Sequence, residues 1–271
     1  MLPYLKDFYL DAEDAICSAQ LFSDKPLFNV VVPVLPRIGN HTDFDALRLH
    51  TDINLQFVSI DSVTKNACPP ADLIILPGSK NTRADLTSLK KAGWEKHLLK
   101  HLRYGGKIIG VCGGYQMLGN TIHDLTGIED KPGSTEGFAM LDIETTMEAN
   151  KLLCNSAATF LHPEFANVEL QGYEIHCGVT TLSEQQQTRR LLKFNEQNPD
   201  EEPFDGAYSE DNKVIGTYMH GLFDHANATK ALLKWAGLDT QASIDLDDIR
   251  EQQLDRLAEA IDQHCQLPAI E

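Results

Sequence analysis

The chain has 271 residues, of which 42% are hydrophobic and 23% are charged. These values are typical of a globular protein with one or two domains and exclude disorder, collagen and coiled coil. Lysine and arginine number 23 against 40 aspartate and glutamate, which gives a net charge of -17. Such acidity argues against nucleic-acid binding and against docking on anionic membranes.

No apolar run approaches the length of a membrane span, and the first residues lack the pattern of a signal peptide. We therefore expect a cytoplasmic location. The six cysteines are scattered without a CxxC pair, which gives no support for a zinc ribbon or a thioredoxin-type site. The sequence thus predicts no metal site, and most of the thiols are expected to be structural.

The first half of the chain alternates apolar runs with helical patterns. Four runs rich in β-branched residues are predicted as buried strands, at residues 27–35, 55–60, 71–76 and 107–111. The leucines between the last two predict helical segments, interrupted at Gly93. Strands that are apolar throughout and separated by helices indicate an α/β, doubly wound, mostly parallel sheet flanked by helices.

The second half has a different pattern. Strands are predicted at residues 172–182 and 214–219, and helices around 228–236 and 246–264. The segment 1–26 is expected to be a linker or a remnant of another unit, which leaves 27–271 as the main domain.

The most informative segment is a glycine-flanked cysteine at residues 110–114 (GVCGG), which follows a strand and precedes a helical pattern. This G-x-nucleophile-x-G arrangement is typical of a sharp strand-to-helix turn. Such a turn strains the backbone and leaves no room for neighbouring side chains, which explains the glycines. It also places the thiol of Cys112 at a helix N-terminus, where free N–H groups favour a thiolate. The alternative is that Cys112 is a small buried residue at a strand end.

A thiolate nucleophile needs a base, most often histidine. His220 is the preferred candidate because it ends a predicted strand and is followed by Gly221. His162 is the rival, since it forms a His-x-Glu pair with Glu164, but it follows only a weak apolar run. His176 is the third candidate.

A second glycine turn follows the third predicted strand, at residues 76–82 (LPGSKNT). Its backbone N–H groups are suited to completing an oxyanion hole. The alternatives are a phosphate-binding loop or a plain turn. No Walker motif is present in the chain, so an ATP site is not supported here.

Five motifs in this order resemble the C-terminal glutamine amidotransferase domain of cobyric acid synthases, over roughly residues 27–225. They are RIGNHTDFD at 37–45, LPGSKNT at 76–82, CGGYQMLG at 112–119, YEIH at 173–176 and GTYMHG at 216–221. The resemblance implies a class I, cysteine-dependent glutaminase. By motif match, Cys112 is the nucleophile and His220 its base, Gly78, Ser79 and Gly113 form the oxyanion region, and Gln116, Tyr173, Glu174 and His176 lie near the glutamine pocket.

The same resemblance implies a role in cobalamin biosynthesis. Ammonia from glutamine would serve the ATP-dependent amidation of adenosylcobyrinic acid a,c-diamide, a corrinoid acceptor. ATP and magnesium are expected only in the N-terminal synthetase domain of that family, which this sequence lacks, so no cofactor is expected in this chain. Leu222 stands where most class I glutaminases have glutamate, and a Cys112–His220 dyad is therefore expected, with the group that orients His220 left open.

Two other functions fit the same residues. One is the glutaminase partner of a different ATP-dependent ligase, such as a cell-wall amidotransferase. The other is a non-catalytic module that uses the fold to bind a partner.

Overall fold

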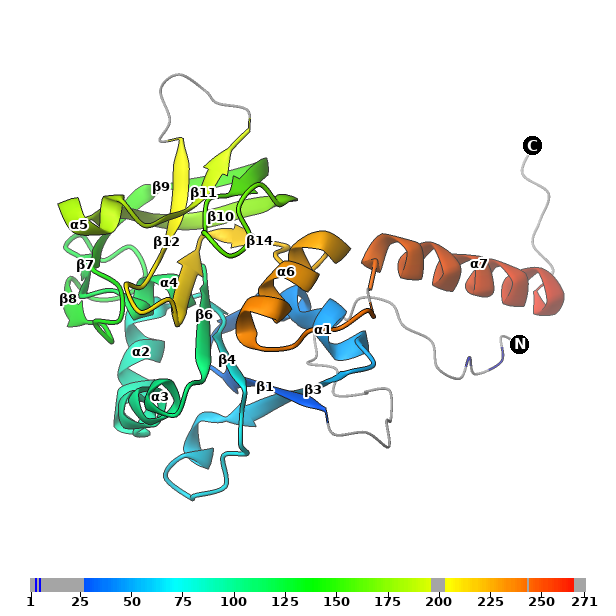
Figure 1. Ribbon diagram of the computed structural model, residues 1–271, viewed down its shortest axis with the longest axis horizontal. Helices are drawn as coiled ribbons and strands as arrows, with labels where there is room; N and C mark the ends of the chain where they lie inside the picture. The colour runs from blue at the N-terminus through cyan, green and yellow to red at the C-terminus, as the bar shows by residue number, and fades with distance from the viewer. Residues whose placement is uncertain (1–2, 4, 6–26, 196–202, 243, 266–271) are drawn as a thin grey trace.

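The computed structural model describes residues 3, 5, 27–195, 203–242 and 244–265. Almost all of the segment 1–26 lies outside the described residues, so its prediction as a linker or remnant is not tested. Within the described part, the sheet has one parallel half and one antiparallel half (Figure 1).

The parallel half confirms the predicted fold class. Its neighbouring strands run in the order β3, β1, β4, β6 and β13. Their bounds are Phe28–Val34 for β1, Ile53–Ser59 for β3, Leu73–Leu76 for β4, Lys107–Val111 for β6 and Val214–Thr217 for β13. The central strands are apolar throughout because both faces of the sheet are covered, and all four residues of β4 are fully buried.

Helices lie on both sides of this parallel half, with α2 and α3 on one side and α1 and α6 on the other (Figure 1). They span Asp45–Leu49 (α1), Thr82–Lys91 (α2), Trp94–Arg103 (α3) and Ala226–Ala236 (α6). Gly93 separates α2 from α3 with φ of +83°, a conformation that favours glycine. The last helix, α7 (Leu246–His264), extends away from the sheet. No helix in the described residues is long and apolar enough to cross a membrane.

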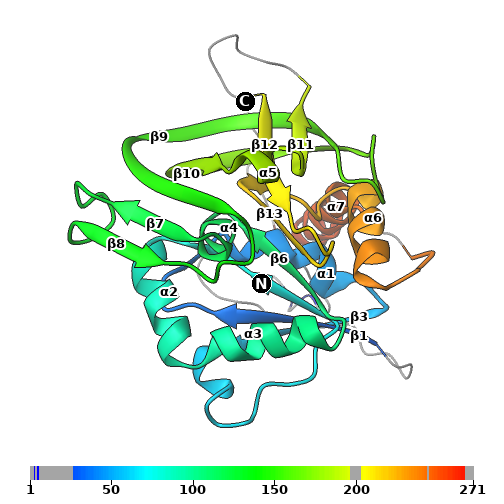
Figure 2. The same ribbon diagram turned by 60° about the vertical axis from the view of Figure 1, so that its left-hand side comes forward.

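The antiparallel half is larger than the sequence predicts. It contains β9 (Ile143–Phe160), β10 (Glu169–Leu182), β11 (Arg190–Phe194), β12 (Phe204–Tyr208) and β14 (Met219–His220). The curved strand β9 was not predicted (Figure 2), because its first half alternates buried and exposed residues instead of forming an apolar run.

The remaining elements are short. They are β2 (Ile38–Gly39), the 3-10 helices η1 (His41–Phe44) and η2 (Ile60–Ser62), β5 (Gly78–Ser79), α4 (Gly113–Leu118), β7 (Thr121–Asp124), β8 (Gly133–Glu136) and α5 (Glu184–Gln187). Three of the predicted site segments follow β4, β6 and β13 at the carboxyl ends of these parallel strands. Because those ends meet at one edge of the sheet, the segments come together there.

Candidate active site

Cys112 occupies the turn between β6 and α4 in a strained conformation. Its φ is 51° and its ψ is -108°, in the left-handed half of backbone space that residues with a side chain rarely adopt. The sulfur lies 3.5 Å from the carbonyl oxygen of Ile175 on β10. Strain of this kind persists only where surrounding structure imposes it, and it is concentrated at functional sites.

Two glycines make this turn possible. A Cβ atom on Gly110 would lie 2.5 Å from Leu118 Cδ1, and one on Gly114 would lie 2.0 Å from the carbonyl oxygen of Leu76. Helix α4 therefore packs against β4 and β6 at a distance that only glycine permits. The G-x-C-x-G spacing in the sequence follows from this packing.

His220 faces a carboxylate to which the sequence pattern assigned no role. Its Nδ1 lies 2.6 Å from Asp43 Oδ2, and both side chains are almost completely buried. Asp43 lies on η1, in the motif at residues 37–45. Because a carboxylate only accepts hydrogen bonds, we assign the Nδ1 proton to His220. Asp43 is thus the group that orients the His220 ring.

Other residues enclose the same imidazole ring. Tyr173 stacks on His220 with ring centroids 4.9 Å apart and an interplanar angle of 13°. The Asn40 amide donates to the Tyr173 hydroxyl at 3.0 Å and lies 3.3 Å from His220 Nδ1. Asn40 has φ of 51° and precedes η1, so one turn delivers both Asn40 and Asp43 to the ring.

The electrostatics of this cluster favour a charged imidazole. Burial alone would lower the pKa of His220, but its contacts with Asp43 and Cys112 raise the pKa from 6.5 to about 10. At neutral pH His220 is therefore protonated. Burial and the nearby Asp43 charge raise the pKa of Tyr173 to about 12, so its hydroxyl stays neutral.

The predicted oxyanion residues meet beside Cys112. Gly78 and Ser79 line the same cleft as Cys112 and His220. A Cβ atom on Gly113 would lie 2.9 Å from the backbone nitrogen of Ser79, so the turn after β4 touches the start of α4. Backbone N–H groups from both segments are thus available around one point next to Cys112.

The cleft has a volume of about 420 Å³. Gln116 and His176, two of the residues predicted to lie near a glutamine pocket, line this cleft. The Gln116 amide donates to the Tyr218 hydroxyl at 3.1 Å, and the His176 ring stacks on Tyr218 at 3.7 Å. Two charged residues that the sequence pattern did not indicate, Glu129 and Lys151, also line the cleft.

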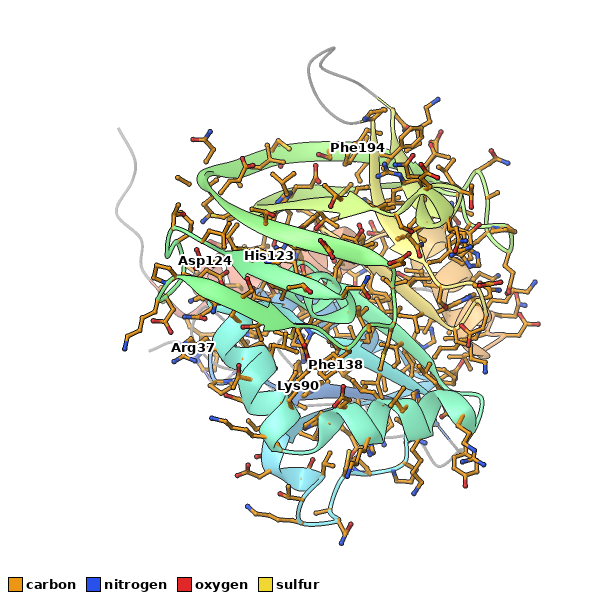
Figure 3. The ribbon with its side chains drawn as sticks, turned by 90° about the vertical axis from the view of Figure 1, so that its left-hand side faces the viewer. Arg37, Lys90, His123, Asp124, Phe138 and Phe194 are labelled. Carbon is orange, nitrogen blue, oxygen red and sulfur yellow. The ribbon has the colours of Figure 1, made fainter. Side chains whose placement is uncertain are left out.

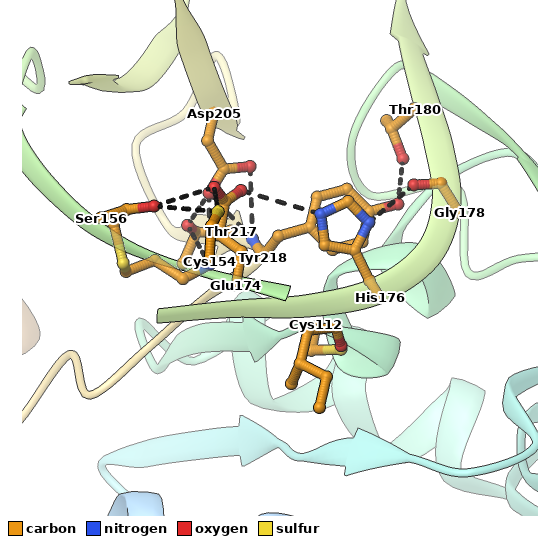
Figure 4. A network of polar contacts seen from close by, with 12 residues as sticks. Cys112, Cys154, Ser156, Glu174, His176, Gly178, Thr180, Asp205, Thr217 and Tyr218 are labelled. Atoms are coloured by element: carbon orange, nitrogen blue, oxygen red, sulfur yellow. Dashed lines mark hydrogen bonds and ion pairs between the residues drawn. The ribbon is translucent and has the colours of Figure 1, made fainter. Parts of the chain in front are cut away.

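Glu174 does not line this cleft. It lies on the side of β10 away from Cys112 (Figure 4), beside a second cavity of about 200 Å³ that it shares with Asp205. Ser156 donates a hydrogen bond to Glu174 at 3.2 Å. A role of Glu174 in substrate binding stays a prediction, since its side chain lies beside the second cavity, whereas Tyr173 stacks on His220.

Asp205 shapes the chain just before His220. Its carboxylate is buried and accepts hydrogen bonds from the hydroxyl of Thr217 and from the backbone N–H groups of Tyr218 and Met219. These bonds hold the irregular turn between β13 and β14. Burial and the neighbouring Glu174 charge raise the pKa of Asp205 to about 6.

The rival base His162 has a different environment. It is completely buried, stacks on Phe165 at 4.2 Å and bonds to the side chain of Asn212. It is not among the residues that line the cleft. Its surroundings are those of a core histidine.

The described residues contain no group of three or more histidine, cysteine, aspartate or glutamate side chains arranged to hold a metal ion. The cysteines among them are all free thiols.

Comparison with known proteins adds to this geometry. Residues 29–228 match the profile of the CobB/CobQ-like glutamine amidotransferase domain. The chain is 47% identical over 281 residues to a cobyric acid synthase of Shewanella oneidensis, and 42% identical over 274 residues to one of Marinomonas sp.. Both alignments cover 100% of this chain but 55% and 54% of the relatives, so the chain spans about half of their length.

A solved structure shares the fold. The structure of PurLQS from Thermotoga maritima superposes with a TM-score of 0.55 at 15% identity, covering 85% of this chain and 99% of the other. At this identity the likeness supports the architecture alone.

Proposed function

The chain belongs to the CobB/CobQ-like glutamine amidotransferase family, and from that premise we propose that it hydrolyses glutamine through Cys112, His220 and Asp43. One observation carries the proposal. The strained Cys112 opens onto a cleft that also holds His220, and a buried carboxylate keeps that histidine protonated.

In the first step, the Cys112 thiolate attacks the side-chain carbonyl carbon of glutamine. The carbonyl oxygen gains negative charge, which the N–H groups around Gly78, Ser79 and Gly113 stabilise. The imidazolium of His220 then protonates the amide nitrogen as it leaves. Ammonia departs and a γ-glutamyl thioester remains on Cys112.

In the second step, water attacks the thioester. The neutral imidazole of His220 accepts a proton from this water, and glutamate is released with the thiolate restored. Asp43 holds the same ring throughout and stabilises it whenever it carries the proton. This assignment extends the expected dyad to a triad whose third member comes from the N-terminal part of the domain.

The ammonia produced is proposed to serve a synthetase unit. The relatives that match are named cobyric acid synthases and are about twice as long as this chain. We therefore propose that the partner unit binds ATP and magnesium and amidates a corrinoid, adenosylcobyrinic acid a,c-diamide, at carboxylates of its periphery. A cytoplasmic location and the absence of a cofactor in this chain stay predictions.

Glutamate release from glutamine tests the proposal, with Cys112→Ala as the variant and Cys177→Ala as the matched control in the same cleft. The wild type and Cys177→Ala are expected to release glutamate, and Cys112→Ala is expected to release none above the uncatalysed rate. Full activity of Cys112→Ala would contradict the mechanism, and an inactive wild type would favour the non-catalytic module.

A further inference from the structure

The cleft beside the turn after β6 holds a second thiol. Cys112 and Cys177 both line this cleft, and within the described residues no other cysteine does. Cys177 lies on β10, two residues beyond Ile175, whose carbonyl oxygen is 3.5 Å from the Cys112 sulfur. The Cys177 thiol is also within electrostatic range of Cys112. The hydrolysis of glutamine proposed above uses only the first of these two thiols.

An irregularity in the antiparallel half of the sheet carries Cys177. The register between β9 and β10 shifts at this residue, so that Cys177 alone separates two regular stretches of pairing on β10 while residues 148–151 separate them on β9. Irregularities of this kind re-aim side chains and are common next to active sites. A disulfide requires the two Cα atoms to lie within about 7 Å of each other. Because Cys177 stands outside the regular pairing, its backbone has the freedom to reach this separation from Cys112.

The surroundings give the two thiols different charges. The protonated ring of His220 contacts the Cys112 sulfur, and a cation beside a sulfur favours the thiolate. Burial raises the pKa of Cys177, the charge of Lys151 opposes this effect, and the charge of Glu129 adds to it. Cys177 is therefore a neutral thiol at neutral pH. Since oxidants attack thiolates in preference to thiols, Cys112 is the sulfur that is oxidised first.

The negative charge near Cys177 is held in place by the loop after β7. Asp124, at the end of β7 (Figure 3), is completely buried and accepts hydrogen bonds from the N–H groups of Ile128 at 2.7 Å and Glu129 at 3.1 Å. The Glu129 carboxylate in turn accepts a hydrogen bond from the Thr82 N–H at 2.6 Å. Glu129 therefore stays in the cleft and keeps Cys177 protonated.

We propose that Cys112 and Cys177 form a reversible oxidation site for hydrogen peroxide, in which Cys177 is the resolving thiol. In the first step, the Cys112 thiolate attacks one peroxide oxygen and the O–O bond breaks. The departing hydroxide takes the proton of the His220 imidazolium and leaves as water. Cys112 then carries a sulfenic acid, so its sulfur has lost two electrons and the peroxide has gained them.

In the second step, the Cys177 sulfur attacks the sulfenic sulfur of Cys112. The S–O bond breaks, and the hydroxyl group leaves as water with the proton of the Cys177 thiol. The resulting disulfide removes the thiolate that glutamine hydrolysis needs, and it protects Cys112 from irreversible oxidation to a sulfinic acid. A thiol reductant restores both cysteines. The site thus goes beyond the proposed function, because it gives the same sulfur a second reaction.

Peptide mass spectrometry without a reductant tests this site. After treatment of the wild-type chain with hydrogen peroxide, we expect a cross-linked pair of peptides that contain Cys112 and Cys177 and that together have lost the mass of two hydrogen atoms. Dithiothreitol is expected to separate the pair. Oxidation of Cys112 to a sulfinic acid while Cys177 stays a thiol would overturn the inference.

Cys177→Ala is the informative variant. Without the resolving thiol, Cys112 is expected to gain the mass of two oxygen atoms as a sulfinic acid, which dithiothreitol does not reduce. The glutaminase activity recovered after peroxide and then dithiothreitol should be lower than in wild type on the order of ten-fold. Cys154→Ala is the matched control, since Cys154 lies on β9 with its sulfur 3.7 Å from Glu174 Oε2, on the side of β10 away from Cys112. Equal recovery in Cys177→Ala, Cys154→Ala and wild type would overturn the inference.

Failure of the inference and failure of the proposed function are distinguishable, because the cross-link is detected by mass and not by activity. A wild type that hydrolyses glutamine but forms no bond between Cys112 and Cys177 overturns only the inference. A wild type that forms this bond but hydrolyses no glutamine overturns only the proposed function.

Discussion

Replacing Asp43 by asparagine tests whether this carboxylate holds and charges the catalytic histidine. The variant keeps the size of the side chain but removes its negative charge. The rise in the pKa of His220 from 6.5 to about 10 corresponds to roughly 5 kcal/mol in favour of the imidazolium. Asp43 acts through both a hydrogen bond and its charge, and Cys112 contributes the rest. We assign about half of this energy, ~2–3 kcal/mol, to Asp43.

The expected effect on catalysis follows from that energy. In Asp43→Asn the step in which the neutral His220 ring accepts a proton from water should slow on the order of 100-fold, since 1.4 kcal/mol is a factor of ten, and kcat at neutral pH should fall accordingly. The high-pH limb of the rate profile reports loss of the His220 proton. It is expected near pH 10 in wild type and about two pH units lower in the variant.

The ion pair between His220 and Asp43 should also make the free energy of unfolding depend on pH. Because the pKa of His220 is raised on folding, the ion pair contributes its full stabilisation below pH 6.5 and loses it as pH rises to about 10. Urea unfolding should therefore show the largest deficit of Asp43→Asn near pH 6 and little deficit at pH 10.

Asp45→Asn is the matched control. Asp45 directly follows η1, the 3-10 helix that carries Asp43, but its Oδ1 lies 2.9 Å from Arg48 Nε, with which it forms an ion pair. A normal rate and an unchanged high-pH limb in Asp43→Asn would refute the assignment of Asp43.

Two further predictions concern buried groups near the site. Asp205 has a pKa raised from 3.8 to about 6, so its ionisation costs the wild type up to ~3 kcal/mol of stability as pH rises from 4 to 7. In urea unfolding, the free energy of unfolding of Asp205→Asn should therefore rise relative to that of wild type over this pH range. A difference between the two proteins that does not change with pH would contradict this expectation. His162→Ala should lower the free energy of unfolding by ~2–4 kcal/mol, because the substitution leaves a cavity in the core. Its kcat should stay within a few-fold of wild type. A loss of activity as large as that of Cys112→Ala would restore His162 as a candidate base.

The parallel half of the fold was predictable because its strands are buried on both faces. Residues such as Val30–Val32 on β1 and Leu73–Leu76 on β4 form unbroken apolar runs, and such runs stand out in a sequence. Strand β9 was missed because its alternation of Ile143, Thr145 and Met147 with exposed residues looks polar on average. A search for alternation with period two would have found it.

The site was predictable where local backbone geometry leaves a mark on the sequence. The packing of Gly110 and Gly114 requires glycine, so the glycine spacing predicts the tight turn that carries Cys112. Asp43 leaves no comparable mark, because it meets His220 across 177 positions of sequence. Its motif stands out in the sequence, but only the folded chain brings the carboxylate to the ring.

Glu129 shows the same limit. It lies in the loop after β7, where the buried Asp124 carboxylate accepts hydrogen bonds from the N–H groups of Ile128 and Glu129, and its own carboxylate accepts one from Thr82 at the start of α2. The spacing of residues in the sequence does not reveal which charged side chains long-range contacts bring into the cleft.

The most direct test of the central claim is to trap the covalent intermediate. Wild type is mixed with isotopically labelled glutamine, quenched in acid within one turnover, digested and analysed by peptide mass spectrometry. A labelled glutamyl group on the peptide that contains Cys112, absent from Cys112→Ala, is the result we predict. Hydrolysis of glutamine with the label on no cysteine, or with the label on Cys177 in place of Cys112, would contradict the account.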